Sequence, residues 1–365
     1  MVTAKNAAFV ARLERFEHTV ARNVVQLASK VPEFVLRRWA RVVDGARLHP
    51  EAQLLLKLQS LSGVKRLGGI DPTLLRTRMR RDARVHAGAV IPVGAVRDLT
   101  IPGAAGPLEA RHYAPRAHAR PRPIIVFFHG GGFVTGDLDT HDRPCRALCR
   151  ELDVHVLSVA YRLAPEHPFP AAVDDAQAAL RHAQQHAADY GADPERVVIA
   201  GDSAGGNLAA VATLLAVRAG EPAPVLQILL YPTVDSIEER PSVSLFGEGF
   251  FLTKQDILWF REQYARGHDL GDPRLSPLRA PDLTGMPPAI IITAGFDPLR
   301  DEAEDYAERL RAAGNQVDLY RVPDQIHGFI NFGSLSDAAH AAIVRVAGMA
   351  RRRLEEARNA STTAA

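Results

Sequence analysis

Apolar residues recur at helical spacing through the first quarter of the chain. Between residues 8 and 28, six of them fall at intervals of three and four, which predicts one apolar stripe on a helix. A second helix is expected from Pro32 to near Gly45, with Val42 and Val43 in its apolar face. Residues 48–61 and 72–84 repeat the pattern around a glycine pair. No strand is therefore expected before about residue 96.

From there, short apolar runs alternate with longer helical segments. The expected strands are 96–101, 108–113, 124–128, 154–161, 197–200, 225–230, 289–293 and 317–322. The expected helices are 139–152, 170–189, 204–219, 300–313 and 337–356. This alternation predicts an α/β fold, in which helices cover both faces of a mostly parallel central sheet.

Two segments depart from the alternation. Residues 233–280 hold several aromatic residues and a helix with Trp259 and Phe260, and such an insertion could cover the carboxyl edge of the sheet. The residues after Glu356 are small and polar, so we expect a frayed tail there.

Composition narrows the class of protein. The chain has 365 residues, of which 47% are hydrophobic and 24% charged, so disordered, collagen-like and coiled-coil classes are excluded. Its two cysteines exclude a disulfide scaffold. Cys145, Cys149 and His141 lie close in sequence, but their spacing matches no recognised zinc motif, so both thiols are expected to be reduced helix residues.

The charge is unevenly distributed. Residues 1–84 carry 17 Lys and Arg against 7 Asp and Glu, whereas the rest of the chain carries 27 against 35. A basic segment of this kind can serve a nucleic acid or a membrane surface. Nucleic acid is disfavoured, because no aromatic-rich basic strand or known motif accompanies the charge. With no apolar signal core and no apolar run of membrane length, a cytoplasmic location is expected.

Gly201-Asp202-Ser203-Ala204-Gly205 matches the pattern GxSxG between an expected strand and an expected helix. A serine at such a sharp turn stands at the end of the sheet, and the helix N-terminus places amide donors and a positive dipole beside it. The alternative is a chance match in a loop. The context favours Ser203 as a nucleophile.

A second glycine-rich motif, His129-Gly130-Gly131-Gly132, follows the strand 124–128. Such glycines let backbone N–H groups converge on one point, as an acyl-transfer oxyanion requires. A phosphate cradle is the weaker interpretation, since no phosphate-binding pattern is present. The expected donors are the N–H groups of Gly131, Gly132 and Ala204, while His129 and Gly130 are expected to support the loop.

A serine nucleophile needs a base, and the base needs a carboxylate. His327 follows the last expected strand, and Asp297 directly follows the strand before it. Both would lie at the carboxyl edge of the sheet, where α/β folds bind ligands. Asp297 could instead cap the next helix, and Asp301 and Glu302 are rival acids. The rivals fall inside that helix, so Asp297 is preferred.

These motifs together resemble the hormone-sensitive-lipase-like branch of the α/β-hydrolase superfamily, and its bacterial family IV esterases in particular. The matching segments are HGGGF at 129–133, YRLAPEHPFPAA at 161–172, GDSAG at 201–205, DPL at 297–299 and HGF at 327–329. The resemblance implies an α/β-hydrolase fold with a helical cap, the triad Ser203, Asp297 and His327, and an oxyanion hole at Gly131, Gly132 and Ala204. Asp202 is expected to be a neighbour rather than a catalytic acid.

The resemblance also suggests how the chain is divided. We expect a helical extension at 1–47, the N-terminal part of the cap at 48–95, the hydrolase core at 96–232 and 281–357, a cap insertion at 233–280, and a tail at 358–365. The family pattern does not account for the extension. It could pack on the cap, form a homodimer contact, lie on a membrane surface, or simply present a solvated face.

The predicted activity is hydrolysis of small, short- to medium-chain carboxylic esters through an acyl-enzyme, without a metal or organic cofactor. Because His327 must be neutral to accept a proton, activity should rise from acid to neutral pH. Aromatic residues are expected to line the acyl pocket, although each could equally pack cap on core: Phe133, Phe246, Phe250, Phe251, Trp259, Phe260 and Phe329.

Three alternatives remain open. An amidase or deacetylase could use the same triad. A non-catalytic relative could bind a small ligand, although the presence of His327 disfavours this. A membrane- or nucleic-acid-binding adaptor could use the basic N-terminus.

Overall fold

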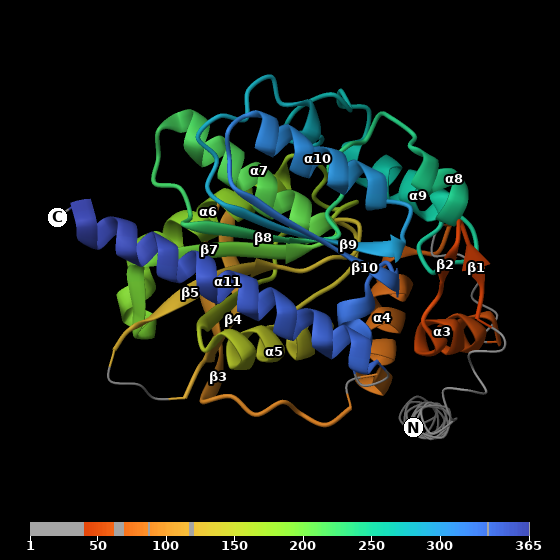
Figure 1. The fold of residues 1–365 in the computed structure, drawn as a ribbon, viewed down its shortest axis with the longest axis horizontal. Helices are drawn as coiled ribbons and strands as arrows, with labels where there is room; N and C mark the ends of the chain where they lie inside the picture. Colours follow the sequence, from red (N-terminus) through yellow and green to blue (C-terminus); the bar gives the residue numbers. More distant parts are fainter. Residues whose placement is uncertain (1–39, 62–68, 87, 117–119, 334–335, 365) are drawn as a thin grey trace, which may run out of the picture.

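A computed structural model describes residues 40–61, 69–86, 88–116, 120–333 and 336–364 (Figure 1). The helices expected at 8–28 and from Pro32 onward, and the basic extension they form, lie largely outside these residues. The description below concerns the catalytic core and the elements that cover it.

An eight-stranded sheet with the order β10-β9-β8-β7-β5-β6-β4-β3 forms the centre of the fold (Figure 1). β3 pairs with β4, and β4 with β6, in antiparallel fashion, whereas every other pair is parallel. The strands are β3 (Ala95–Gly103), β4 (Gly106–Ala114), β5 (Arg122–Phe128), β6 (His155–Val159), β7 (Ala192–Asp202), β8 (Leu226–Leu230), β9 (Ala289–Phe296) and β10 (Val317–Ile326). The parallel strands end at one edge, and the site lies there.

Helices cover both faces of the sheet, because side chains along each strand alternate between two apolar clusters. Ile124, Val126 and Phe128 join one cluster, whereas Ile125 and Phe127 join the other. The first cluster includes residues of α6 (Ala171–His186), α7 (Ala204–Ala219) and α10 (Arg300–Ala312), and the second includes residues of α5 (Asp142–Leu152) and α11 (Asp337–Ala364). The predicted α/β architecture, a mostly parallel sheet with helices on both faces, is confirmed.

Four further helices lie near the carboxyl edge of the sheet: α3 (Pro50–Leu61), α4 (Pro72–His86), α8 (Pro241–Phe246) and α9 (Lys254–Ala265). α9 begins at a capping box, in which Thr253 Oγ1 accepts a hydrogen bond from the backbone N–H of Asp256 and the Asp256 carboxylate accepts one from the N–H of Thr253. Short 3-10 helices complete the description: η1 (Ala187–Tyr190), η2 (Pro277–Arg279) and η3 (Phe329–Phe332).

One expectation about the first quarter is wrong. Val42 and Val43 form β1 (Val42–Val43), which pairs antiparallel with β2 (Ala46–Arg47), instead of continuing a helix. Asp44 and Gly45 connect them with φ angles of 51° and 75°. Two consecutive left-handed residues, of which the second is Gly, make the tight turn that joins two strands.

The end of the chain also differs from expectation. α11 continues to Ala364, through residues that were expected to fray. Ala357, Arg358 and Ala360 have high helix propensity, which is consistent with continuation of the helix past Glu356. Within the described ranges, no helix combines the length and apolar character of a membrane span.

Candidate active site

Ser203 is the single residue between the end of β7 and the start of α7. Its φ of 55° and ψ of −119° lie outside the regions that most residues adopt. The turn is tight enough to need glycine beside it, because a Cβ on Gly205 would lie 1.9 Å from the carbonyl oxygen of Phe128. The N–H of Ser203 donates to the carbonyl of Leu230 at 2.9 Å. The strand-to-helix turn therefore fixes the hydroxyl at the edge of the sheet.

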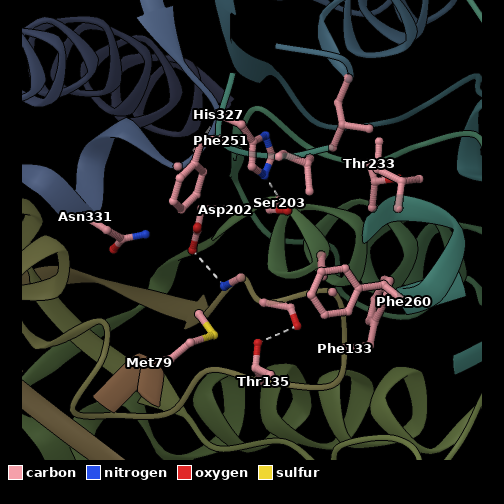
Figure 2. Close-up of a pocket in the computed structure, with 18 of the residues that line it drawn as sticks. Met79, Phe133, Thr135, Asp202, Ser203, Thr233, Phe251, Phe260, His327 and Asn331 are labelled. Atoms are coloured by element: carbon pink, nitrogen blue, oxygen red, sulfur yellow. Dashed lines mark hydrogen bonds between the residues drawn. The ribbon is translucent and has the colours of Figure 1, made fainter. Parts of the chain in front are cut away.

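His327 joins Ser203 to Asp297. Its Nε2 lies 2.9 Å from Ser203 Oγ (Figure 2). Its Nδ1 lies 2.7 Å from Asp297 Oδ2. His327 directly follows β10, and Asp297 directly follows β9. Asp297 is fully buried, and its second oxygen accepts the N–H of Leu299 at 2.8 Å. The structure thus brings the three predicted residues into one hydrogen-bonded chain.

The two rival acids have other contacts. Asp301 pairs with Arg300 and accepts the N–H of Ser242, each at 2.8 Å. Glu302 Oε1 accepts the N–H of Val234 at 2.8 Å. Burial raises the pKa of Glu302 from 4.5 to about 8. Neither contact involves His327.

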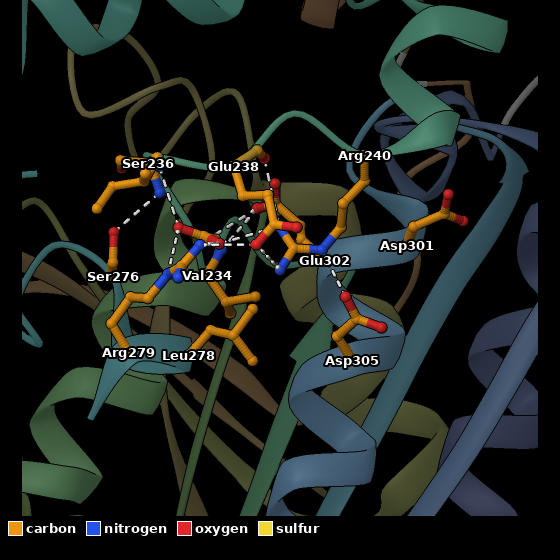
Figure 3. A network of polar contacts seen from close by, with 12 residues as sticks. Val234, Ser236, Glu238, Arg240, Ser276, Leu278, Arg279, Asp301, Glu302 and Asp305 are labelled. Atoms are coloured by element: carbon orange, nitrogen blue, oxygen red, sulfur yellow. Dashed lines mark hydrogen bonds and ion pairs between the residues drawn. The ribbon is translucent and has the colours of Figure 1, made fainter. Parts of the chain in front are cut away.

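Glu302 lies beside a cluster of charges that joins the inserted segment to α10 (Figure 3). Asp235, whose side chain is fully buried, pairs with Arg240 at 2.9 Å and with Arg279 at 2.7 Å. Arg240 also pairs with Asp305 on α10 at 2.5 Å. Two arginines therefore compensate the buried charge of Asp235.

The loop after β5 is folded around Gly131. Its carbonyl accepts the N–H groups of Val134 and Thr135, at 3.1 and 2.9 Å, and the Thr135 hydroxyl at 2.9 Å. Gly131 and Gly132 have φ angles of 121° and 62°, which L side chains rarely adopt. Both glycines line the cavity that contains Ser203, as does Ala204. The three expected donor residues therefore line the same cavity as the candidate nucleophile.

His129 is held within the same loop. Its Nδ1 lies 2.9 Å from the carbonyl oxygen of Gly130, its own carbonyl accepts the Tyr161 hydroxyl at 2.7 Å, and its ring stacks on Tyr161 at 4.4 Å. Burial lowers the pKa of His129 to about 4, so the ring is neutral at neutral pH. These contacts are those of a residue that braces the loop.

Asp202 connects the glycine motif at 201–205 to the one at 129–132. The sequence predicted only that Asp202 is a neighbour of Ser203, and did not predict this contact. Its Oδ1 accepts the N–H of Gly130 at 2.8 Å and lies 3.2 Å from His141 Nε2. Burial alone would raise the pKa of Asp202, but His141 and the Gly130 N–H hold it below its usual value. The only hint of this role in the sequence was the position of Asp202 beside Ser203. Its partners Gly130 and His141 are distant in sequence, so local spacing could not identify them.

A cavity of about 1210 Å³ opens in front of Ser203. Its lining includes residues at the carboxyl edge of the sheet, among them Ser203 and His327, and side chains of α3, α4 and α9. Figure 2 shows the arrangement around Ser203 of Met79, Phe133, Thr135, Thr233, Phe260 and Asn331.

The aromatic residues expected at the acyl pocket fall into two groups. Phe133, Phe251 and Phe260 line the cavity, and Phe133 stacks on Tyr264 at 3.9 Å. Four others do not line it, which corrects the expectation: Phe246, Phe250, Trp259 and Phe329.

These four side chains pack elsewhere for identifiable reasons. Phe246 and Phe250 pack with Phe296 of β9, at ring distances of 5.4 and 5.5 Å. Phe329 is buried against Tyr231 at 5.4 Å, and Trp259 contacts the outer side of the apolar cluster beside Phe260. The sequence did not identify the lining residues Leu58, Leu75, Met79, Leu258 or Asn331.

Cys145 and Cys149 are free and buried. Burial raises the pKa of the Cys149 thiol to about 12, so the thiol stays protonated. Among the described residues, no three side chains of His, Cys, Asp or Glu are grouped as ligands for a metal ion.

Known proteins share this fold and much of this sequence. The family model of the alpha/beta hydrolase fold matches residues 125–331. A carboxylic ester hydrolase of Mycobacterium tuberculosis, LipN, is 51% identical over 308 residues, which are 82% of this chain and 81% of the relative. An ethyl acetate hydrolase of Pseudomonas putida is 35% identical over 82% of this chain and 97% of its own.

A solved structure agrees closely with the fold. It is an ester hydrolase from the metagenome of Lake Arreo, in complex with a derivative of bipyridine phosphonate. The TM-score is 0.80 at 40% identity, over 83% of this chain and 98% of that one. The chain therefore belongs to the alpha/beta hydrolase fold family, and within it to the hormone-sensitive-lipase-like branch whose motifs it carries.

Proposed function

We propose that the protein is a serine carboxylic ester hydrolase, with Ser203 as nucleophile, His327 as general base and acid, and Asp297 as the carboxylate that orients the imidazole. The observation that carries this proposal is the chain of two hydrogen bonds, of 2.9 and 2.7 Å, from Ser203 through His327 to Asp297. The names of LipN and the Pseudomonas putida relative support the same class of reaction.

The reaction proceeds in two halves. Ser203 Oγ attacks the ester carbonyl carbon as its proton passes to His327 Nε2, and the carbonyl oxygen becomes an anion. The N–H groups of Gly131, Gly132 and Ala204 hold that anion. When the tetrahedral intermediate collapses, His327 protonates the leaving alcohol and the acyl group stays on Ser203. Water then repeats the sequence and releases the acid.

The substrates are small carboxylic esters of short to medium acyl length. Apolar side chains, including Leu75, Met79 and Phe251, contribute to the cavity wall, which suits an alkyl chain. The Pseudomonas putida relative is named for ethyl acetate, an ester at the short end of this range.

The test is a series of p-nitrophenyl esters of increasing acyl length, with wild type and Ser203→Ala. Wild type should hydrolyse the short members, and Ser203→Ala should lose on the order of 10,000-fold or more in kcat. A phosphonate should label wild type on Ser203. An enzyme that cleaves amides faster than matched esters would favour the amidase alternative, and an unlabelled, inactive wild type would favour a ligand-binding role.

Three other predictions from the sequence remain predictions. They are the division into core, cap and extension, the cytoplasmic location, and a homodimer or membrane contact through the N-terminal helices. Comparing the full chain with a chain that starts at residue 40, by vesicle sedimentation and light scattering, would test the last two roles.

A further inference from the structure

Arg76 lies on α4, and its guanidinium group contacts two loops of the core, at Val134 and at 164–166. Nε donates to the carbonyl of Val134 at 2.8 Å, and Nη2 donates to the carbonyl of Ala164 at 2.8 Å. Nη1 and Nη2 pair with the two carboxylate oxygens of Glu166, at 2.9 and 2.7 Å. The side chain is only 19% exposed. A planar fork can make these contacts at once, which a lysine ammonium cannot.

Both carbonyls belong to loops that shape the active site. Val134 lies in the turn that folds over Gly131, and its own N–H donates to the Gly131 carbonyl. The N–H of Ala164 donates to the carbonyl of Phe133 at 2.9 Å, so the second loop is bonded to the first. Val134 and Ala164 are fully buried. If Arg76 were lost, two buried carbonyl groups would lose a strong charged donor.

The same helix forms part of the cavity wall. Leu75 and Met79, on either side of Arg76 in the helix, line the cavity, and Leu75 is 1% exposed. Met79 and Thr135 line the same cavity as Ser203, and Figure 2 labels all three. Arg76 therefore joins the part of the cavity wall that α4 forms to the turn that holds the proposed oxyanion donors.

Two other arginines of α4 make simpler contacts. Arg80 pairs with the carboxylate of Asp137, and Arg84 lies 3.7 Å from the carboxylate of Asp139. The Arg84 and Asp139 side chains are 66% and 47% exposed, so this pair contributes little. Arg84 is not a lining residue, which makes it a suitable control.

We infer that Arg76 is a positioning residue that couples the seating of α4 to the geometry of the oxyanion loop. With α4 seated, the guanidinium fixes the 131–135 turn from outside, and the N–H groups of Gly131 and Gly132 stay directed at the reacting carbonyl. The inference rests on the proposed esterase function. It extends the machinery of the reaction to a cap helix that carries none of the reacting groups.

The experiment compares Arg76→Met, Arg76→Lys and Arg84→Met on a short p-nitrophenyl ester, which limits the contacts of the substrate with the α4 side chains that line the cavity. Arg76→Met should lower kcat about 10- to 100-fold, less than outright loss of an oxyanion donor, with KM little changed. Arg76→Lys should fall between wild type and Arg76→Met. Arg84→Met should match wild type within about twofold.

A second readout separates positioning from a loss of folded protein. A trifluoromethyl ketone accepts Ser203 Oγ at its carbonyl carbon, the serine proton passes to His327, and the carbonyl oxygen becomes an anion in the oxyanion hole. Its inhibition constant should rise by the factor by which kcat falls. A lower fraction of folded enzyme would reduce the apparent kcat and leave that constant unchanged.

The inference is overturned if Arg76→Met and Arg76→Lys keep wild-type kcat, or if kcat falls while the inhibition constant does not move. Should Arg76→Met fail to fold, Arg76→Lys carries the test through the same two readouts. Failure of the proposed function looks different, because wild type and Arg84→Met would then also be inactive on the ester.

Discussion

The cavity has two walls that are built in different ways. The core wall consists of the turns that follow the strands, with Gly131, Gly132, Ser203, Ala204 and His327. Backbone hydrogen bonds and glycines hold these turns, as the 2.9 Å bonds from Ser203 N to Leu230 O and from Thr135 N to Gly131 O illustrate.

The cap wall consists of side chains on α3, α4 and α9, such as Leu58, Met79 and Leu258. Side-chain contacts hold these helices and the adjoining segment in place, including those of Arg76 and the bond from Arg261 Nη1 to the Ser236 carbonyl at 2.9 Å. The difference indicates a division of labour. The turns of the core wall set the positions of the reacting atoms, whereas the cap wall can change size by substitution of the side chains that line it. Changes in the core turns, and in Arg76, which contacts them from α4, should therefore act on kcat, and changes in the lining side chains of the cap wall should act on substrate choice.

Among the changes that compare the two walls, Gly132→Ala should have the largest effect. A Cβ at this position would lie 2.3 Å from the Phe260 ring, on a backbone with a φ of +62°. Either the loop or α9 must move, and the Gly132 N–H leaves its expected place. We expect kcat on a short ester to fall roughly 100- to 1,000-fold, as for loss of an oxyanion donor.

Gly220→Ala is the matched control. Gly220 ends α7 with a φ of +66°, but a Cβ there would meet no atom within 4 Å. It shares the backbone strain, which costs about 1–2 kcal/mol, without the contact. Its melting temperature should fall while kcat stays at the wild-type value. An equal loss of activity in the two variants would show that backbone strain, and not the position of the loop, causes the loss, and wild-type activity in both would contradict the prediction.

A change in the cap wall should have a smaller and more selective effect. Leu258 is half-buried on α9 and lines the cavity. Leu258→Trp should narrow the cavity and Leu258→Ala should widen it. We expect kcat/KM for long relative to short esters to shift about 10-fold, in opposite directions, in either the acyl series or the alcohol series.

Phe246→Leu tests whether this selectivity belongs to the cavity wall. Phe246 lies in the same inserted segment but packs against Phe250 and Phe296, outside the cavity. The variant should lose up to about 1.5 kcal/mol of stability without a change in chain-length preference. An altered preference would mean that the shape of the cavity depends on the whole insertion and not on its lining.

The sequence predicts the core wall well because its information is local. Ser203, Asp297 and His327 each occupy the turn after a parallel strand, so recognising the strands places them at one edge. The Asp44-Gly45 pair was an equally local signal for the β1–β2 hairpin, but the apolar spacing around it also fitted a helix.

The cap wall could not be predicted in the same way. Phe246 and Phe260 are both buried aromatic residues of one insertion, yet only Phe260 faces the cavity. What separates them is contact with Phe296, a residue far along the chain. Arg76 lies in no motif, and its partners are 58 and 88 residues away. Such pairings depend on tertiary packing, which local spacing does not encode.

The last prediction concerns stability more than activity. It applies to the seam, by which we mean the contact of Glu302 with Val234 and Asp235. Glu302 is 5% exposed, and its carboxyl group accepts the N–H groups of Val234 and Asp235, where the inserted segment leaves the core. Asp235, not Glu302, takes the nearby arginines. Burial therefore raises the pKa of Glu302 to about 8, and the folded protein keeps a proton there that the unfolded chain releases near 4.5.

Between these two pKa values the folded state binds more protons than the unfolded state, so the free energy of unfolding should fall as pH rises, by up to roughly 1.4 kcal/mol per pH unit. Above about 8 both states are ionised, and the loss of stability is complete.

Glu302→Gln cannot titrate at this position, so it serves as the reference. Urea unfolding of wild type and variant from about pH 5 to pH 9 should show that the stability advantage of wild type shrinks or reverses as pH rises. Glu238→Gln is the control, because it removes an exposed carboxylate that pairs with Arg279 in the same cluster and should leave the wild-type slope intact. A constant difference in the free energy of unfolding between wild type and Glu302→Gln across this range would contradict the prediction. Glu302 would then be ionised throughout, and a charged carboxylate, not a neutral acid, would accept the two N–H groups.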